Sequence, residues 1–166
     1  MDTSPASTTP TLRLARHTDA QAIAVMSRCL IELGLRGWSW SPARVLRALQ
    51  HRDFCVVIAE LDRRVAGFAI AEFGDTRLHL SLLAVAAANQ RQGIGRALMA
   101  WLETSALTAG ITEMQLELRA NNVGAQYFYR ALGFESLRTV PGYYSGQETA
   151  IKMHRSLGAD ALHAKK

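Results

Sequence analysis

A short apolar strand that runs into a glycine-bearing turn constrains this chain more than any other feature. Residues 78–85 read LHLSLLAV and end in the run Leu82–Val85, which indicates a strand buried on both faces at the centre of a sheet. The turn 90–96, QRQGIGR, follows and opens a helix. Such a junction offers free backbone N–H groups and a positive helix dipole, so it predicts an anion site, although a tight turn alone also explains both glycines.

Hydrophobic periodicity on either side of this junction predicts further strands and helices. The expected strands are Leu12–Ala15, Phe54–Glu60, Val65–Glu72, Leu78–Val85, Thr112–Arg119, Ser136–Val140 and Thr149–His154. The expected helices begin at Thr18 or Asp19, at Ser41–Pro42, after the 90–96 turn and at Asn121–Asn122. In the first helix, the residues expected to face the core are Ile23, Met26, Cys29, Leu30 and Leu33. The order implies an α/β or α+β fold, a mixed sheet with helices on both faces.

Length and charge narrow the possibilities further. The 166 residues allow one domain, expected over 12–157, with a flexible arm at 1–11 and a flexible tail at 158–166. The 19 basic and 14 acidic residues leave a net charge of +5, which favours an anionic partner. The basic residues are scattered and form no stripe with aromatics, so we expect no nucleic acid. No signal peptide and no apolar run of ~18 residues is apparent, so we expect no membrane and a cytoplasmic protein.

The cysteines and histidines give no sign of a metal or of a cysteine nucleophile. Cys29 and Cys55 have apolar neighbours and no CxxC spacing, so both are expected to be reduced core residues. The five histidines belong to different expected elements and form no short-range ligand cluster, so surface or edge positions are expected. They are His17, His51, His79, His154 and His163.

Several motifs together resemble one known superfamily. The pattern Gln90-x-x-Gly93-x-Gly95 followed by Ala97-Leu98 resembles the pyrophosphate-binding motif of the GNAT N-acetyltransferases, which use acetyl-CoA. The resemblance runs from about Leu12 to Leu157. The segments 116–122, LELRANN, and 129–134, YRALGF, are similar to protein N-terminal acetyltransferases, in particular to the bacterial enzymes that acetylate the N-terminal alanine of a ribosomal protein. The resemblance implies a mixed, mostly antiparallel central sheet flanked by helices.

Residue roles are carried over from the family position by position. Glu117 would be the general base and Tyr129 the general acid, while Tyr143 and Tyr144 would line the acceptor-peptide groove. The residues that would hold acetyl-CoA are Leu83, Ala84, Val85, Arg91, Gln92, Gly93, Ile94, Gly95, Arg96 and Asn122. Each has an ordinary structural alternative: a solvated strand glutamate, an aromatic packed on its helix, a helix cap, or tyrosines that cover a sheet edge.

Two segments depart from the family pattern. Residues 86–89, AAAN, stand where members often have Asp or Pro followed by an aromatic. Residues 73–77, FGDTR, are short and nearly neutral where some ribosomal-alanine enzymes are more acidic.

The chemistry of amine acetylation bears on the acceptor independently of the family. An α-amino group with a pKa of about 7.7–8.0 is roughly one-tenth neutral at pH 7, whereas a lysine side chain near 10.4 is neutral in fewer than about one molecule in a thousand. A single carboxylate base such as Glu117 therefore suits an N-terminus better than a lysine. We expect direct attack in a ternary complex, with the Val85 N–H stabilising the oxyanion.

The expected function is therefore acetyl-CoA-dependent acetylation of a peptide or protein N-terminus, for which a ribosomal protein is one candidate, by a monomer or weak homodimer. One alternative is a GNAT enzyme that acts on a small amine such as an antibiotic, polyamine or amino acid. Another is an acyl-CoA-binding module without turnover.

Overall fold

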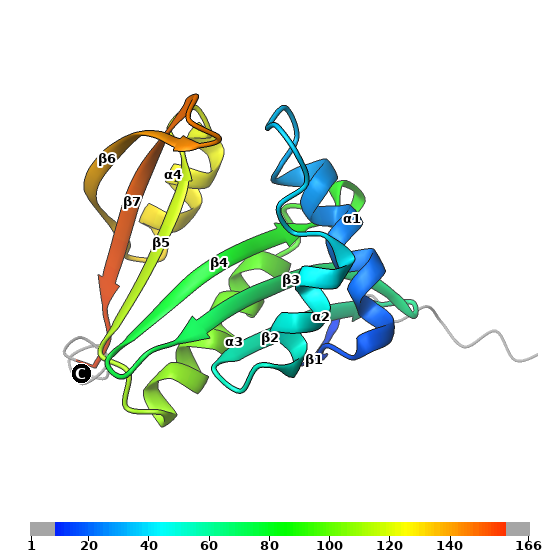
Figure 1. Ribbon diagram of the computed structural model, residues 1–166. Coiled ribbons are helices and arrows are strands. Elements are labelled where there is room, and N and C mark those ends of the chain that lie inside the picture. Colours follow the sequence, from blue (N-terminus) through cyan, green and yellow to red (C-terminus); the bar gives the residue numbers. More distant parts are fainter. Residues whose placement is uncertain (1–8, 159–166) are drawn as a thin grey trace, which may run out of the picture. The chain divides into compact units, whose positions relative to one another are not determined.

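The computed structural model describes residues 9–158, and its elements alternate much as the periodicity predicts (Figure 1). In this range the strands are β1 Thr11–Leu14, β2 Phe54–Leu61, β3 Arg64–Phe73, β4 Arg77–Val85, β5 Glu113–Arg119, β6 Glu135–Tyr144 and β7 Glu148–Ser156. The α-helices are α1 Ala20–Leu30, α2 Pro42–Gln50, α3 Ile94–Thr108 and α4 Val123–Ala131. Short 3-10 turns occupy η1 His17–Asp19 and η2 Ala87–Asn89.

The strands pair in the order β1-β2-β3-β4-β5-β7-β6. β4 and β5 are parallel, whereas β1–β2, β5–β7 and β6–β7 are antiparallel. This confirms the expected mixed, mostly antiparallel sheet. The expected arm and tail lie almost entirely outside the described residues, although β1 already begins at Thr11.

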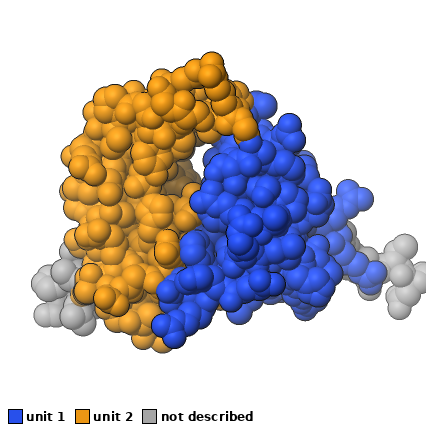
Figure 2. Space-filling model, viewed as in Figure 1, with its two compact units in different colours: residues 1–33, 38–70, 82–99 blue, residues 34–37, 71–81, 100–166 orange. Residues whose placement is uncertain are grey.

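The described chain forms two units, each with its own packing (Figure 2). Unit 1 comprises residues up to 33, 38–70 and 82–99, and unit 2 comprises 34–37, 71–81 and the chain from 100 onward. In unit 1, Phe68 of β3 packs in one cluster with Ile23 of α1 and Val45 of α2. The neighbouring Gly67 faces Ile94 and Leu98 of α3. Successive strand residues point to opposite faces, so unit 1 has helices on both faces of its sheet.

The buried face of α1 differs from the expected one. Ala20, Ile23, Ala24 and Ser27 are buried, whereas the expected core residues Leu30 and Leu33 are 39% and 69% exposed. The reason is that the helix ends at Leu30 and the chain folds back through Glu32. The buried Glu32 carboxylate accepts hydrogen bonds from Ser27 Oγ (2.9 Å) and from the backbone N–H of Ser39 (2.7 Å), and this fixes the turn after the helix.

The prediction of two core cysteines is wrong for Cys29, which is exposed on the outer face of α1. Cys55, in β2, is half-buried, and burial raises its thiol pKa to about 11.

The prediction that β4 ends in a strand buried on both faces is also wrong. Leu82 and Ala84 are buried, but Leu83 and Val85 are only half-buried, so the strand alternates to its end. A continuous apolar run therefore does not establish burial of both faces here.

In unit 2, the expected alternation of β5 and the expected ends of α4 are both observed. Met114, Leu116 and Leu118 are buried on one face of β5, although Gln115 on the polar face is buried as well. Asn122 caps α4 by accepting the Ala125 N–H at 3.1 Å. At the other end Gly133 adopts φ +91°, and the Phe134 N–H bonds the Tyr129 carbonyl at 3.0 Å, which closes the helix as expected.

We predict that Gly67→Ala destabilises the protein by about 1–3 kcal/mol, because β3 has no room for a methyl group there. A Cβ atom at Gly67 would lie 3.0 Å from Ile94 Cγ2 and 3.1 Å from the Ala84 carbonyl oxygen. Gly124→Ala is the control: the nearest atom to its Cβ would be 4.0 Å away, and alanine is the better helix former by up to about 1 kcal/mol. Denaturant unfolding measures both, and equal stability of the two variants would contradict this packing.

Candidate functional site

Unit 1 contains the expected anion-binding turn between β4 and α3. Gln90 lies at its start and donates a hydrogen bond from Nε2 to the Val85 carbonyl at 3.0 Å, which ties the turn to the strand end. Arg91 has φ +62° and Gly93 φ +84°, and a Cβ at Gly93 would meet open space. Gly93 is therefore required by backbone conformation rather than by close packing.

The side chains of this turn divide between anchoring and exposure. Ile94 is 2% exposed and fixes the first turn of α3 in the core, where the Ala97 N–H bonds the Gly93 carbonyl at 3.0 Å. Arg91, Gln92 and Arg96 are exposed, and Gly95 is half-buried. Two arginines at the amino end of a 15-residue helix fit a diphosphate, because guanidinium groups and the first N–H groups of a helix both bind phosphate oxygens.

The backbone at the end of β4 fits the role expected of Val85. The Ala86 N–H bonds the Ala66 carbonyl of β3 at 2.8 Å. Successive residues of a strand direct their N–H groups to opposite edges, so the Val85 N–H points away from β3. Leu83 and Val85 are half-buried and Ala84 is buried.

Unit 2 places the candidate base, Glu117, among polar groups from neighbouring strands. Its carboxylate is 11% exposed, and Oε2 lies 2.5 Å from Nε2 of His79 on β4. Oε1 lies 3.9 Å from Lys152 Nζ on β7. Glu117 is directly opposite Lys152 in the β5–β7 ladder, and Lys152 is directly opposite Arg138 in the β6–β7 ladder.

These neighbours decide the charge of Glu117. Burial alone would raise the pKa of this carboxyl, but the hydrogen bond and positive charge of His79, helped by Lys152 and Arg138, outweigh it and hold the pKa below its ordinary value. Glu117 is therefore an ionised proton acceptor at neutral pH.

His79 is a site residue that sequence reasoning missed. A surface or edge position was expected, whereas its side chain is 38% exposed and hydrogen-bonded to Glu117. The available signal was the alternation in LHLSL, which sets His79 off the apolar face of β4. Nothing in the sequence fixed the parallel register, Leu78 opposite Met114, that brings His79 to Glu117.

Tyr143 and Tyr144 end β6 next to a tight turn. Their rings pack edge to face with centroids 4.9 Å apart, and Tyr143 is 46% exposed. Burial and the negative charge of Glu117 raise the pKa of Tyr143, and the same causes, with Tyr143, act on Tyr144. The Ser145 hydroxyl after them donates to the Arg36 carbonyl at 3.5 Å, so residues 34–37 lie against this turn.

Tyr129 occupies the buried side of α4. It is 8% exposed and packs edge to face with Phe128 and Phe134, at centroid distances of 5.0 and 5.6 Å. Burial, with a smaller contribution from Tyr144, raises the pKa of its hydroxyl well above the ordinary range. Tyr129 therefore keeps its proton at physiological pH. Asn122 is the N-cap of α4, the ordinary structural role considered for it in the sequence. Its side-chain oxygen accepts the capping hydrogen bond, so its amide nitrogen can still donate one.

Within residues 9–158, no three His, Cys, Asp or Glu side chains are grouped so that they could hold a metal ion. In the same range no helix is long and apolar enough to cross a membrane.

Comparison with known proteins identifies the family of the chain. The model of the acetyltransferase (GNAT) family matches residues 22–134. The uncharacterized N-acetyltransferase MJ1530 of Methanocaldococcus jannaschii is 35% identical over 100 residues, 60% of this chain and 64% of that protein. The ribosomal protein bS18-alanine N-acetyltransferase of Salmonella typhimurium is 37% identical over 95 residues, 55% of this chain and 64% of that protein. The match thus spans just under two thirds of each relative.

A solved structure extends the likeness over most of the chain. The ribosomal-protein-S18-alanine N-acetyltransferase from Escherichia coli superposes with a TM-score of 0.76 at 27% identity, covering 90% of this chain and 94% of that one. Since the family model spans more than half of the sequence, the chain belongs to the GNAT family of acetyltransferases.

Proposed function

We propose that this protein transfers the acetyl group of acetyl-CoA to the α-amino group of a peptide or protein N-terminus. The observation that carries the proposal is the position of Glu117: its side chain is 11% exposed and lies 2.5 Å from His79 and 3.9 Å from Lys152. The negative charge of Glu117 also raises the pKa of Tyr143 and Tyr144 at the end of β6. A buried carboxylate that hydrogen bonds and nearby positive charges keep ionised is suited to accept a proton.

The donor would be held mainly by the turn of unit 1. Residues Arg91 to Arg96 would bind the diphosphate through two guanidinium groups and the first N–H groups of α3. The main chain of Leu83, Ala84 and Val85, together with Asn122, would bind the pantetheine arm. Acetyl-CoA supplies an acyl group already activated as a thioester.

The reaction needs one proton acceptor and one proton donor. As the amine attacks, a nitrogen–carbon bond forms at the acetyl carbonyl and the carbon–sulfur bond breaks. The amine loses a proton to Glu117, and the departing thiolate gains one from Tyr129, so protons and charge balance. The Val85 N–H, directed away from β3, would donate to the oxygen that carries negative charge between these two events.

His79 would act as a positioning residue behind Glu117. Its 2.5 Å contact engages Oε2, and Oε1, 3.9 Å from Lys152, would accept the proton of the amine.

An N-terminal amine is favoured as the acceptor by two observations. One is the chemistry of a single carboxylate base, which suits an amine with a pKa near 8. The other is the similarity to two proteins that are named as ribosomal-protein alanine N-acetyltransferases. Ribosomal protein N-termini are therefore the first candidates among natural acceptors.

We predict that incubation with acetyl-CoA and a peptide library acetylates α-amines, with ribosomal-protein N-termini included in the library. Mass spectrometry with fragment mapping would measure it. A library of drugs, polyamines and amino acids is the parallel arm. Products only on lysine side chains or only on small amines would contradict the proposed acceptor, and acetyl-CoA binding without any product would contradict the proposed enzyme.

We predict that Glu117→Gln lowers kcat about 10²–10⁴-fold, because the amide cannot accept a proton. Tyr129→Phe should slow the reaction too, by removing the proton for the thiolate. Glu113→Gln is the matched control: Glu113 lies on the same face of β5, is bonded by Arg77 and His154, and has no proposed role. Unchanged activity in both test variants would overturn these roles, as would an equal loss in the control.

We predict that kcat/KM rises about tenfold per pH unit below pH 7 and levels off near the acceptor pKa of about 7.7–8.0. The pKa of Glu117 is lowered from its ordinary value of 4.5, so Glu117 is ionised throughout this pH range. The neutral fraction of the amine therefore sets the slope. Stopped assays with two peptides whose α-amine pKa values differ would measure it. An inflection at one pH for both peptides would contradict this origin.

A further inference from the structure

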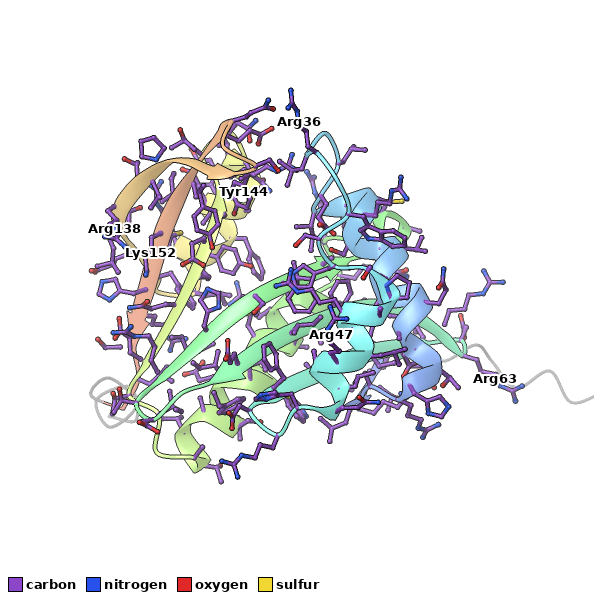
Figure 3. The ribbon with its side chains drawn as sticks, in the orientation of Figure 1. Arg36, Arg47, Arg63, Arg138, Tyr144 and Lys152 are labelled. Carbon is purple, nitrogen blue, oxygen red and sulfur yellow. The ribbon has the colours of Figure 1, made fainter. Side chains whose placement is uncertain are left out.

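The face of unit 2 that holds Glu117 carries more positive charge than its own carboxylates require. Across the ladder Glu117 on β5 is followed by Lys152 on β7 and then by Arg138 on β6. Figure 3 labels Lys152 and Arg138 on these two strands. Lys152 is 3.9 Å from Glu117, but Arg138 is exposed. Among residues 9–158 the Arg138 guanidinium has no hydrogen-bond or ion-pair partner.

The other carboxylates around this face do not account for Arg138. Glu113 is bonded to Arg77 and His154, each at 3.3 Å, and Glu148 lies 3.4 Å from Arg119. Glu135 begins β6 opposite His154, at the other end of the strand from Tyr143 and Tyr144. Lys152 and Arg138 therefore leave a net positive charge next to the candidate base.

Such charge disfavours an acceptor that is itself purely cationic, because like charges a few ångströms apart repel. It favours an acceptor that brings a carboxylate with its amine. Arginine suits this role, since its planar fork binds a carboxylate through two parallel hydrogen bonds.

The spacing of the strands indicates which residue of the acceptor peptide would carry this carboxylate. Neighbouring strands are about 4.7–4.9 Å apart, so the backbone at Arg138 lies about 9–10 Å from that at Glu117, two strands away. An extended peptide advances about 3.3–3.6 Å per residue. If the amine lies at Glu117 and the peptide runs toward β6, the side chain of its second or third residue would reach the cation pair Lys152 and Arg138.

We propose that the acceptor is an acidic N-terminus, with Asp or Glu at its second or third residue, and that Arg138 and Lys152 bind that carboxylate. This inference rests on the proposed function and names the acceptor class for the same site. Arg138 is then a specificity residue, and N-termini with Lys or Arg at the second or third residue are poor acceptors.

The test compares peptides that begin with alanine and differ only at the second and third residues. Asp or Glu, Asn or Gln, and Lys are placed there in turn, and kcat/KM is measured by mass spectrometry. We expect acidic peptides to exceed their amides about tenfold, with lysine peptides slowest. The ratio should shrink as salt rises from 0.05 to about 0.5 M, because the cation pair is open to screening.

Charge variants then tie the preference to Arg138. Arg138→Gln should bring the acid-to-amide ratio close to one, and Arg138→Glu should reverse the order of acidic and lysine peptides. Arg63→Glu makes the same charge change at the exposed β2–β3 turn of unit 1 and should keep the ratio (Figure 3). Each ratio is taken between peptides on one variant, so a general loss of activity cancels, and melting curves confirm that each variant folds.

The outcomes separate the two proposals. Acetylation of α-amines with equal rates for acidic and amide peptides, or with a preference that survives Arg138→Gln, overturns the acidic acceptor and leaves N-terminal acetylation standing. Acetylation of no peptide α-amine overturns the proposed function and this inference with it.

Discussion

The arrangement of unit 2 depends on keeping one carboxylate charged where water scarcely reaches it. The Glu117 side chain is 11% exposed, and an unpaired carboxylate in such a position costs several kcal/mol. His79 at 2.5 Å and Lys152 at 3.9 Å offset that cost and keep the pKa low. Their side chains come from two other strands, so the charge state of Glu117 depends on strand pairing.

That pairing requires the element order of the chain. His79 meets Glu117 because β4 and β5 are parallel, and a parallel pair can only be joined by a crossover, which is α3. Lys152 meets Glu117 because β7 lies antiparallel on the other side of β5, with β6 outside it. The helix that makes the crossover also begins at the Arg91–Arg96 turn. The connection that contains α3 thus makes the parallel pairing at Glu117 possible and also carries the candidate diphosphate site.

Short sequence patterns such as helix caps predict most of the fold. The pairing register between strands far apart in the sequence cannot be predicted from such patterns. The Ser41 cap with Pro42, the Asn122 cap and the Gly133 terminus are short-range patterns, and all three are observed. The expected core face of α1 was wrong because Glu32, five residues beyond Ser27, bonds back to it and ends the helix early. His79 was missed for a similar reason: its contact with Glu117 spans 38 residues, and no local pattern reports such a contact. The roles of Glu117 and Tyr129 came from the family resemblance, since neither spacing nor composition distinguishes them from a solvated glutamate and a packed aromatic.

The cations around Glu117 act on base and acceptor in opposite senses. They lower the pKa of Glu117 and so weaken it as a base, but they also disfavour a protonated amine beside it and so raise the neutral fraction of the acceptor. For an α-amine near pKa 8 about one unit of lowering suffices at pH 7, whereas a lysine side chain near 10.4 needs more than three. Lys152 and His79 are both partly exposed to solvent, which weakens their effect on a neighbouring charge. They therefore fit a lowering of the amine pKa by about one unit better than a lowering by three. The electrostatics therefore support the proposed α-amine acceptor even before the peptide beyond it is considered, and in this proposal the exposed Arg138 acts on that peptide.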